Sequence, residues 1–148
     1  MGTEIFLILL TLCTAFIKRS ETAPALLYTG VAFLFYFVSL SIANPLYLLV
    51  MAMILEVMTV FLLVCLKGCL KSTLVACLIP LSIGALAAHF IGWCLLYNGM
   101  EIGLYNNVID VYWTTILGLF LSMSRWMDGS FIKFIRLFRR HDNQPKII

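Results

Sequence analysis

The chain has 148 residues, of which 63% are hydrophobic and only 11% are charged, and its mean hydropathy is +1.05. Soluble domains carry about 25% charged residues, so this composition excludes an ordinary soluble fold and predicts an all-α integral membrane protein. The net charge of +3 does not indicate nucleic-acid binding, because the basic residues stand beside hydrophobic runs and not on a solvated polar face.

The basic residues form three clusters, which alternate with uncharged or acidic breaks between long apolar runs. In chain order, clusters and breaks are Lys18 and Arg19, Asn44 and Pro45, Lys67 and Lys71, residues 98–110, and residues 125–146. Short loops rich in Lys and Arg stay on the cytoplasmic side of a membrane. The alternation therefore predicts five membrane spans, with the N-terminus outside and the C-terminus in the cytoplasm. A bacterial inner (plasma) membrane is the expected location.

We expect a transmembrane helix bundle over residues 1–128, followed by a cytoplasmic tail over residues 129–148. The predicted spans are 3–17, 25–43, 46–66, 73–97 and 107–123. The first run is interpreted as an uncleaved span, because a signal peptide carries its positive charges before the apolar stretch and not after it. The apolar stretch over residues 25–66 is too long for one crossing at 1.5 Å per residue, and its Asn-Pro pair predicts the turn that divides it.

The tail carries a strongly amphipathic pattern. If it is helical, its basic residues occupy one arc and its phenylalanines the opposite arc. The basic residues are Lys133, Arg136, Arg139 and Arg140. Such a helix lies on the inner leaflet with its basic face toward anionic lipid headgroups. Docking of a cytoplasmic partner is the alternative.

Glu56 is the most informative single residue, because it stands near the middle of the predicted span 46–66 and thus near the bilayer midplane. A carboxylate there costs about 2.5–3.5 kcal/mol on insertion scales, so it should face protein or water. An intramembrane acid indicates a functional site. The alternative is a neutral acid that joins two helices through a hydrogen bond, which typically contributes about 0.6 kcal/mol of stability.

His89 is the second candidate, and a water-bridged pair with Glu56 is possible if the third and fourth spans pack together. Asp110 is the third, and with Glu101 it would form an acidic outer mouth that favours cations.

Small residues at four-residue spacing in the fourth span predict a face that lets a neighbouring helix approach closely. They are Ala76, Pro80, Gly84, Ala88 and Gly92. Polar and small residues in the fifth span also recur at spacings of three or four, and they predict a face turned away from lipid. These are Asn107, Asp110, Thr114, Gly118, Ser122 and Arg125.

The sequence contains no nucleophile elbow, phosphate-binding loop, Cys-x-x-Cys pair or zinc-ligand spacing, so we expect no enzyme, no cofactor and no metal site. Two functions remain open. The first is an oligomeric permeation or transport component that uses Glu56, with His89 and Asp110 in support. The alternative is a non-transporting membrane-embedded partner-binding protein, such as an immunity, exclusion, holin-like or assembly factor. The expected partners are anionic lipids and either a second copy or another membrane protein.

Overall fold

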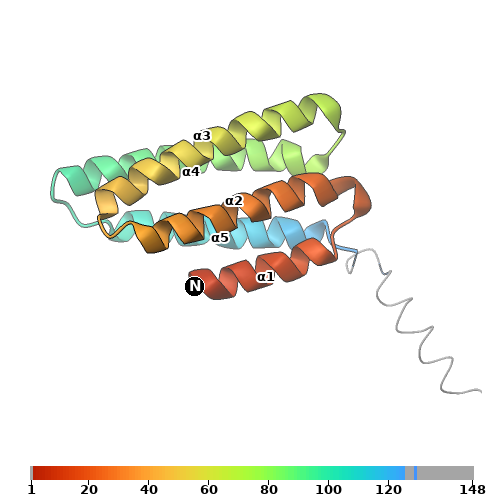
Figure 1. The fold of residues 1–148 in the computed structure, drawn as a ribbon, viewed down its shortest axis with the longest axis horizontal. Helices are drawn as coiled ribbons and strands as arrows, with labels where there is room; N and C mark the ends of the chain where they lie inside the picture. The colour runs from red at the N-terminus through yellow and green to blue at the C-terminus, as the bar shows by residue number, and fades with distance from the viewer. Residues whose placement is uncertain (1, 126–128, 130–148) are drawn as a thin grey trace, which may run out of the picture.

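The computed structural model describes residues 2–125 and 129, and within them the chain forms five α-helices joined by short connections (Figure 1). The helices are α1 (Thr3–Ala15), α2 (Thr22–Ser41), α3 (Pro45–Cys69), α4 (Thr73–Tyr97) and α5 (Gly103–Ser122), with a 3₁₀ turn, η1, at Arg19–Glu21. The predicted all-α fold is confirmed, with five helices among the described residues. The amphipathic tail, with Lys133, Arg136, Arg139 and Arg140, lies outside the described residues.

Three of the described helical segments are long and apolar enough to cross a membrane by length and composition: Arg19–Ser41, Pro45–Cys69 and Thr73–Tyr97. α1 has 13 residues and is therefore about 20 Å long, shorter than the roughly 30 Å hydrocarbon core. α5 has 20 residues, but Asn106, Asn107 and Asp110 near its start lower its hydropathy. Length and composition thus support three spans where the charge pattern predicted five.

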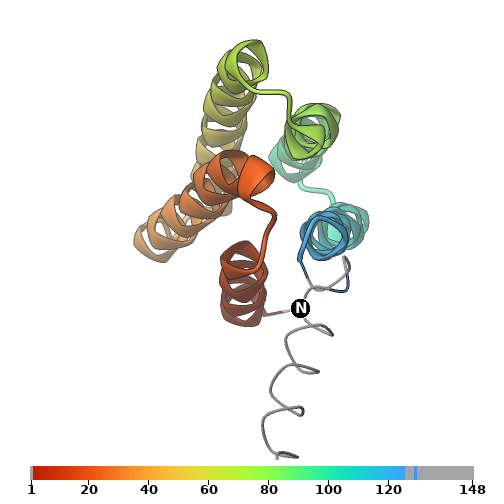
Figure 2. The same cartoon turned by 90° about the vertical axis from the view of Figure 1, so that its right-hand side faces the viewer.

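The helices run up and down and close into a ring (Figure 2). Each helix packs against its neighbours in the chain, and α5 returns to α1. An isolated β-bridge between Ile17 and Ser124 joins the ends of these two helices, with the Arg125 N–H donating to the Phe16 carbonyl at 2.7 Å. The centre of the ring is filled mainly by apolar side chains with no exposed surface, among them Leu10, Leu63, Leu78, Ile116 and Phe120.

The helix boundaries follow local capping chemistry. The Asn44 side chain accepts a hydrogen bond from the Leu46 N–H at 3.0 Å, and Pro45 occupies the first helical position of α3, where its missing N–H costs nothing. The predicted turn at Asn44 and Pro45 is therefore confirmed. At the start of α4, Ser72 Oγ accepts from the Val75 N–H at 3.1 Å.

Glu21 adds a second cap to α4 from a different part of the chain. Its buried carboxylate accepts hydrogen bonds from the Thr73 N–H at 3.1 Å, the Leu74 N–H at 3.2 Å and the Ser72 hydroxyl. A helix N-terminus has unpaired N–H groups and a partial positive charge, so a carboxylate is well placed there. The contact fastens the α1–α2 connection to the α3–α4 connection, and no local pattern in the sequence indicates it.

All described Lys and Arg residues lie at one end of the ring, which we call the basic end (right in Figure 1). They are Lys18, Arg19, Lys67, Lys71 and Arg125. The α2–α3 and α4–α5 connections, with Glu101, lie at the opposite end, which we call the acidic end. The basic clusters and the uncharged or acidic breaks that alternate along the sequence thus lie at opposite ends of one bundle.

Candidate functional site

Glu56 faces the interior of the ring. It belongs to a row of buried positions on α3, spaced by three or four residues, that also includes Ala52 and Thr59. The residue is only 9% exposed, so its carboxyl group is surrounded by protein and not by lipid or bulk solvent.

Two tyrosines from other helices approach this carboxyl group. The Tyr112 hydroxyl, from α5, donates to Glu56 Oε1 at 3.3 Å, and the hydroxyl oxygens of Tyr112 and Tyr28, from α2, are 2.5 Å apart. Both tyrosines are buried. Sequence reasoning missed Tyr112, because a tyrosine in an apolar helix is equally expected at a membrane interface and carries no periodic signal of its own.

The second oxygen of the carboxyl group has no such partner. Glu56 Oε2 and the Ser82 hydroxyl are buried without a hydrogen-bond partner among the described residues. The Ser82 side chain, from α4, lies beside Glu56 and Tyr112, although its hydroxyl group does not reach hydrogen-bond geometry with either. A buried polar oxygen without a partner costs free energy, so Oε2 is suited to receive a proton, a water molecule or a cation.

His89 lies on α4 and is 5% exposed. Its Nδ1 is 2.9 Å from the hydroxyl oxygen of Tyr105, which comes from the first turns of α5. The Tyr105 ring can come this close because residue 92 is glycine: a Cβ there would lie 2.6 Å from Tyr105 Cδ2. Gly92 therefore admits the ring, and the ring brings a hydroxyl group to His89.

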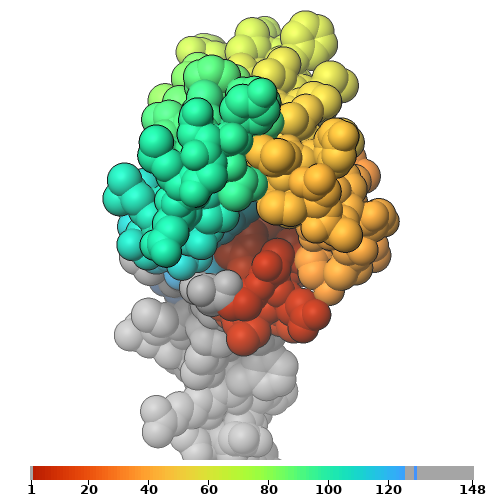
Figure 3. Space-filling model, turned by 90° about the vertical axis from the view of Figure 1, so that its left-hand side faces the viewer, coloured from red at the N-terminus to blue at the C-terminus, as the bar shows by residue number. Residues whose placement is uncertain are grey.

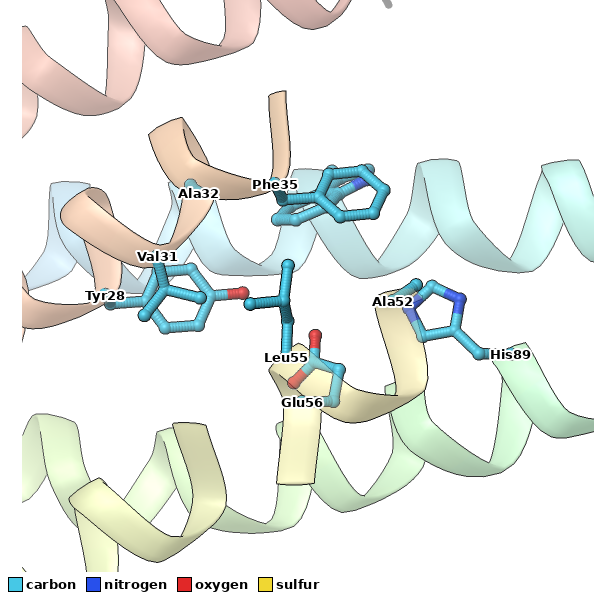
Figure 4. A pocket seen from close by; sticks show the side chains of 9 residues that line it. Tyr28, Val31, Ala32, Phe35, Ala52, Leu55, Glu56 and His89 are labelled. Atoms are coloured by element: carbon cyan, nitrogen blue, oxygen red, sulfur yellow. The ribbon is translucent and has the colours of Figure 1, made fainter. Parts of the chain in front are cut away.

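Glu56 and His89 border one small cavity (Figure 4). Its volume is about 20 Å³, and Tyr28, Ala52 and Trp113 are among the other residues that line it. Because a water molecule needs roughly 10–15 Å³, the cavity has room for about one water and not for an organic solute. α3 and α4 do pack together, as the predicted water-bridged pair of Glu56 and His89 requires.

Asp110, the third candidate, is not part of this cluster. It lies on the exposed face of α5, whereas Tyr112, two residues later and so about 200° around the helix, points inward. The other members of the predicted stripe on this helix are exposed as well: Asn107, Thr114, Gly118, Ser122 and Arg125. Within the single chain this stripe therefore does not face the centre of the ring, because Tyr112 and large apolar residues of α5 fill the centre instead.

The small-residue row of α4 is only partly in contact with the rest of the chain. Ala76, Pro80 and Gly84 are exposed, Ala88 is half-buried, and Gly92 is buried. Positions four apart advance about 40° beyond a full turn, so the row winds about 160° around the helix from its first to its last member. Only its end at Gly92 serves as a close-packing position within the described structure.

Among the residues that the structure describes, no group of three or more His, Cys, Asp or Glu side chains could hold a metal ion. Comparison with protein-family models, with curated proteins and with solved structures finds no match to this chain. The function is therefore inferred from the site itself.

Proposed function

We propose that this protein is a small polytopic membrane protein that acts as an oligomeric permeation or transport component for a small cation. Glu56 is the group that binds the cation, and His89 supports it from the neighbouring helix. In this proposal the basic end faces the cytoplasm of a bacterial cell, as short basic loops do. α1 and α5 are embedded together with the three apolar segments against which they pack, although α1 alone is too short to span.

The observation that carries this proposal is the unpartnered oxygen of Glu56. The side chain is nine-tenths buried and borders the cavity, one oxygen is held by Tyr112, and Oε2 has no hydrogen-bond partner among the described residues. A purely structural acid would be expected to place both oxygens in hydrogen bonds, because an unsatisfied buried acceptor is destabilising. An acid that binds and releases a positively charged species needs such a free position.

The outer face of α5 supports the proposal of an oligomer. Asn107, Thr114 and Ser122 are exposed on the single chain, and polar residues within a membrane almost always face protein or water. We propose that this face contacts a second copy or lines water between copies. Asp110 shares this face, so its supporting role is assigned to the oligomer contact and not to the Glu56 cavity.

The direct test is ion flux into vesicles that contain the purified protein. Glu56→Gln should retain the fold and the amount of inserted protein but abolish the flux, because glutamine can accept the Tyr112 hydrogen bond but cannot bind a proton or balance a cation. Glu4→Gln is the matched control, since Glu4 also accepts a tyrosine hydrogen bond, from Tyr36 at 3.1 Å, but at an exposed position. Unchanged flux in Glu56→Gln would remove Glu56 from the transport site.

The second candidate function is partner binding without transport. It is favoured by the exposed part of the small-residue row, where Ala76, Pro80 and Gly84 leave α4 open to close approach by another helix. In that case the wild-type protein carries no ion, Gly84→Leu disrupts the complex in the membrane, and Glu56→Gln leaves the complex intact.

A further inference from the structure

We propose that the transported species is the proton, and that one water molecule held between Glu56 and His89 completes the path by which it reaches the carboxyl group. This inference rests on the proposed function and narrows it to one cation. A site for a metal ion or an organic cation would need a larger cavity with more polar lining groups.

The structure holds both hydrogen-bond partners that the water would need, the Glu56 carboxyl group and the His89 ring. Figure 4 shows the Glu56 carboxyl group and the His89 ring bordering the same space, with one ring nitrogen turned toward Glu56. Since Nδ1 is bonded to Tyr105, the nitrogen that faces Glu56 is Nε2. Oε2 is without a partner among the described residues, and the cavity of about 20 Å³ has the size of one water.

The donors and acceptors match along the whole chain of groups. With the Tyr105 hydroxyl donating to Nδ1, neutral His89 carries its proton on Nε2 and can donate it to the water, which in turn donates to Glu56 Oε2. On the other side of the carboxyl group, Tyr112 donates to Oε1 and pairs with Tyr28. Each of these groups can accept one proton while it releases another, as a proton relay requires.

A metal ion does not fit the same space. Most of the side chains that line the cavity are apolar, and Glu56, His89 and Tyr28 are its only lining groups with polar atoms besides the Trp113 indole. Cation channels replace the hydration shell of an ion with rings of carbonyl or carboxylate oxygens. A cavity for a single water molecule, with one carboxyl group, cannot do this.

The transfer step balances with one water and no other reactant. Tyr105 passes its hydroxyl proton to Nδ1 and takes up another proton from the acidic end. The resulting imidazolium releases its Nε2 proton to the water oxygen, while the water passes one of its own protons to Glu56 Oε2. Neutral His89, an intact water molecule and a protonated carboxyl group remain.

The outer member of this relay, Tyr105, lies near the acidic end. Tyr105 lies two residues after the start of α5, beside the α4–α5 connection. Figure 3 looks onto this end, which is hollowed between the α4–α5 segment in green, the α2–α3 segment in orange and α1 in red. Toward the basic end the ring is closed by Leu63, Leu78 and Ile116, none of which is exposed. Glu56 is therefore loaded from the acidic end, and release to the other side requires a rearrangement of this apolar layer.

The water can be displaced without touching an ionisable group. Ala52 lines the cavity and is 2% exposed, so Ala52→Val fills the space that the water needs. Ala87→Val, on the exposed side of α4, adds the same two carbons outside the ring and is the matched control. Because crowding the cavity adds a barrier to each transfer, we expect Ala52→Val to lower proton flux about tenfold or more and the control to leave it unchanged.

A second readout follows the carboxyl group itself. The infrared band that differs between wild type and Glu56→Gln reports protonation of Glu56. The hydrogen–deuterium exchange of this carboxyl group, followed through the same band, should slow about tenfold in Ala52→Val. If Ala52→Val does not fold, His89→Phe removes the Nε2 donor at similar size and should slow the same exchange. Normal exchange and normal proton flux in the folded variant would overturn the relay.

Flux measurements on the wild-type protein distinguish failure of the proton relay from failure of the proposed transport function on which it rests. Flux of protons that does not depend on added Na⁺ or K⁺ is the expected result. Flux of Na⁺ or K⁺ lost in Glu56→Gln would refute the proton relay and leave cation transport through Glu56 standing. Absence of any flux would refute the proposed function as well.

Discussion

Gly92→Ala is the substitution for which the structure makes the sharpest statement about stability. A Cβ at this position would lie 2.6 Å from Cδ2, 2.9 Å from Cε2 and 3.0 Å from Cγ of Tyr105. These are ring atoms of a half-buried side chain whose hydroxyl group is bonded to His89, so the ring has to shift and the hydrogen bond is lost.

The magnitude follows from three terms. Forcing an extra carbon into a packed contact costs about 1–3 kcal/mol, and losing the hydrogen bond adds about 0.5–1.5 kcal/mol. Replacing glycine by alanine inside a helix returns about 1 kcal/mol. We therefore expect Gly92→Ala to lower the free energy of unfolding by about 2 kcal/mol.

Gly84→Ala is the matched control, because it makes the same change on the same helix. No heavy atom lies within 4 Å of the Cβ that it would add. The variant should be as stable as wild type or more stable by up to about 1 kcal/mol. Unfolding of both purified variants in mixed detergent micelles, followed by tryptophan fluorescence, measures the difference.

The close contact itself can be isolated with a double-mutant cycle. Tyr105→Ala removes the ring that the new methyl group meets, so Gly92→Ala should cost much less in that background than in wild type. Equal stability of Gly92→Ala and Gly84→Ala, or a cost that is the same with and without the Tyr105 ring, would refute the reasoning. It would mean that α4 and α5 do not approach each other as closely as described.

Three further outcomes are expected. Glu21→Ala should lower the free energy of unfolding by about 1–2 kcal/mol, since it removes the cap from α4, whereas Glu4→Ala should have little effect; equal effects would contradict the capping role. Reporter fusions that are active only outside the cytoplasm should be active at Asn44 and at Gly103 and inactive at the C-terminus, and an active C-terminal fusion would contradict the proposed orientation. A peptide of residues 129–148 should bind anionic vesicles with an affinity that falls as salt rises, and equal binding to neutral vesicles would show that its charges are incidental.

The course of the chain was readable from local signals. The helix over residues 73–97 coincides with α4, and the Asn44–Pro45 break ends α2 and starts α3. Both depend on features that act within a few residues: a polar cap, a proline at the first helical position, and loops of Lys or Asn between apolar runs. The position of Glu56 in the middle of its helix was evident for the same reason.

The composition of the site was not readable in this way. Tyr112, Tyr28 and Ser82 come to Glu56 from three other helices, and Asp110 turns away although its residue type resembles that of Glu56. A helix that is apolar on nearly every side has no strong periodic signal, so the sequence does not show which face turns inward. The small-residue row illustrates this, since a four-residue spacing drifts around a helix that repeats every 3.6 residues.

The sequence by itself therefore determined the number of helices, the places where the chain turns, and the sorting of basic residues to one end. These properties depend on segment length, helix breakers and charge. The first two act locally, and the charges are sorted because successive connections lie at opposite ends of the bundle. Only the tertiary structure decided the rotation of each helix, the hydrogen bond from Tyr112 to Glu56, the fit of Tyr105 on Gly92, and the capping of α4 by Glu21. Each of these joins residues far apart in the chain, and the close packing of all the helices against one another sets which atoms meet.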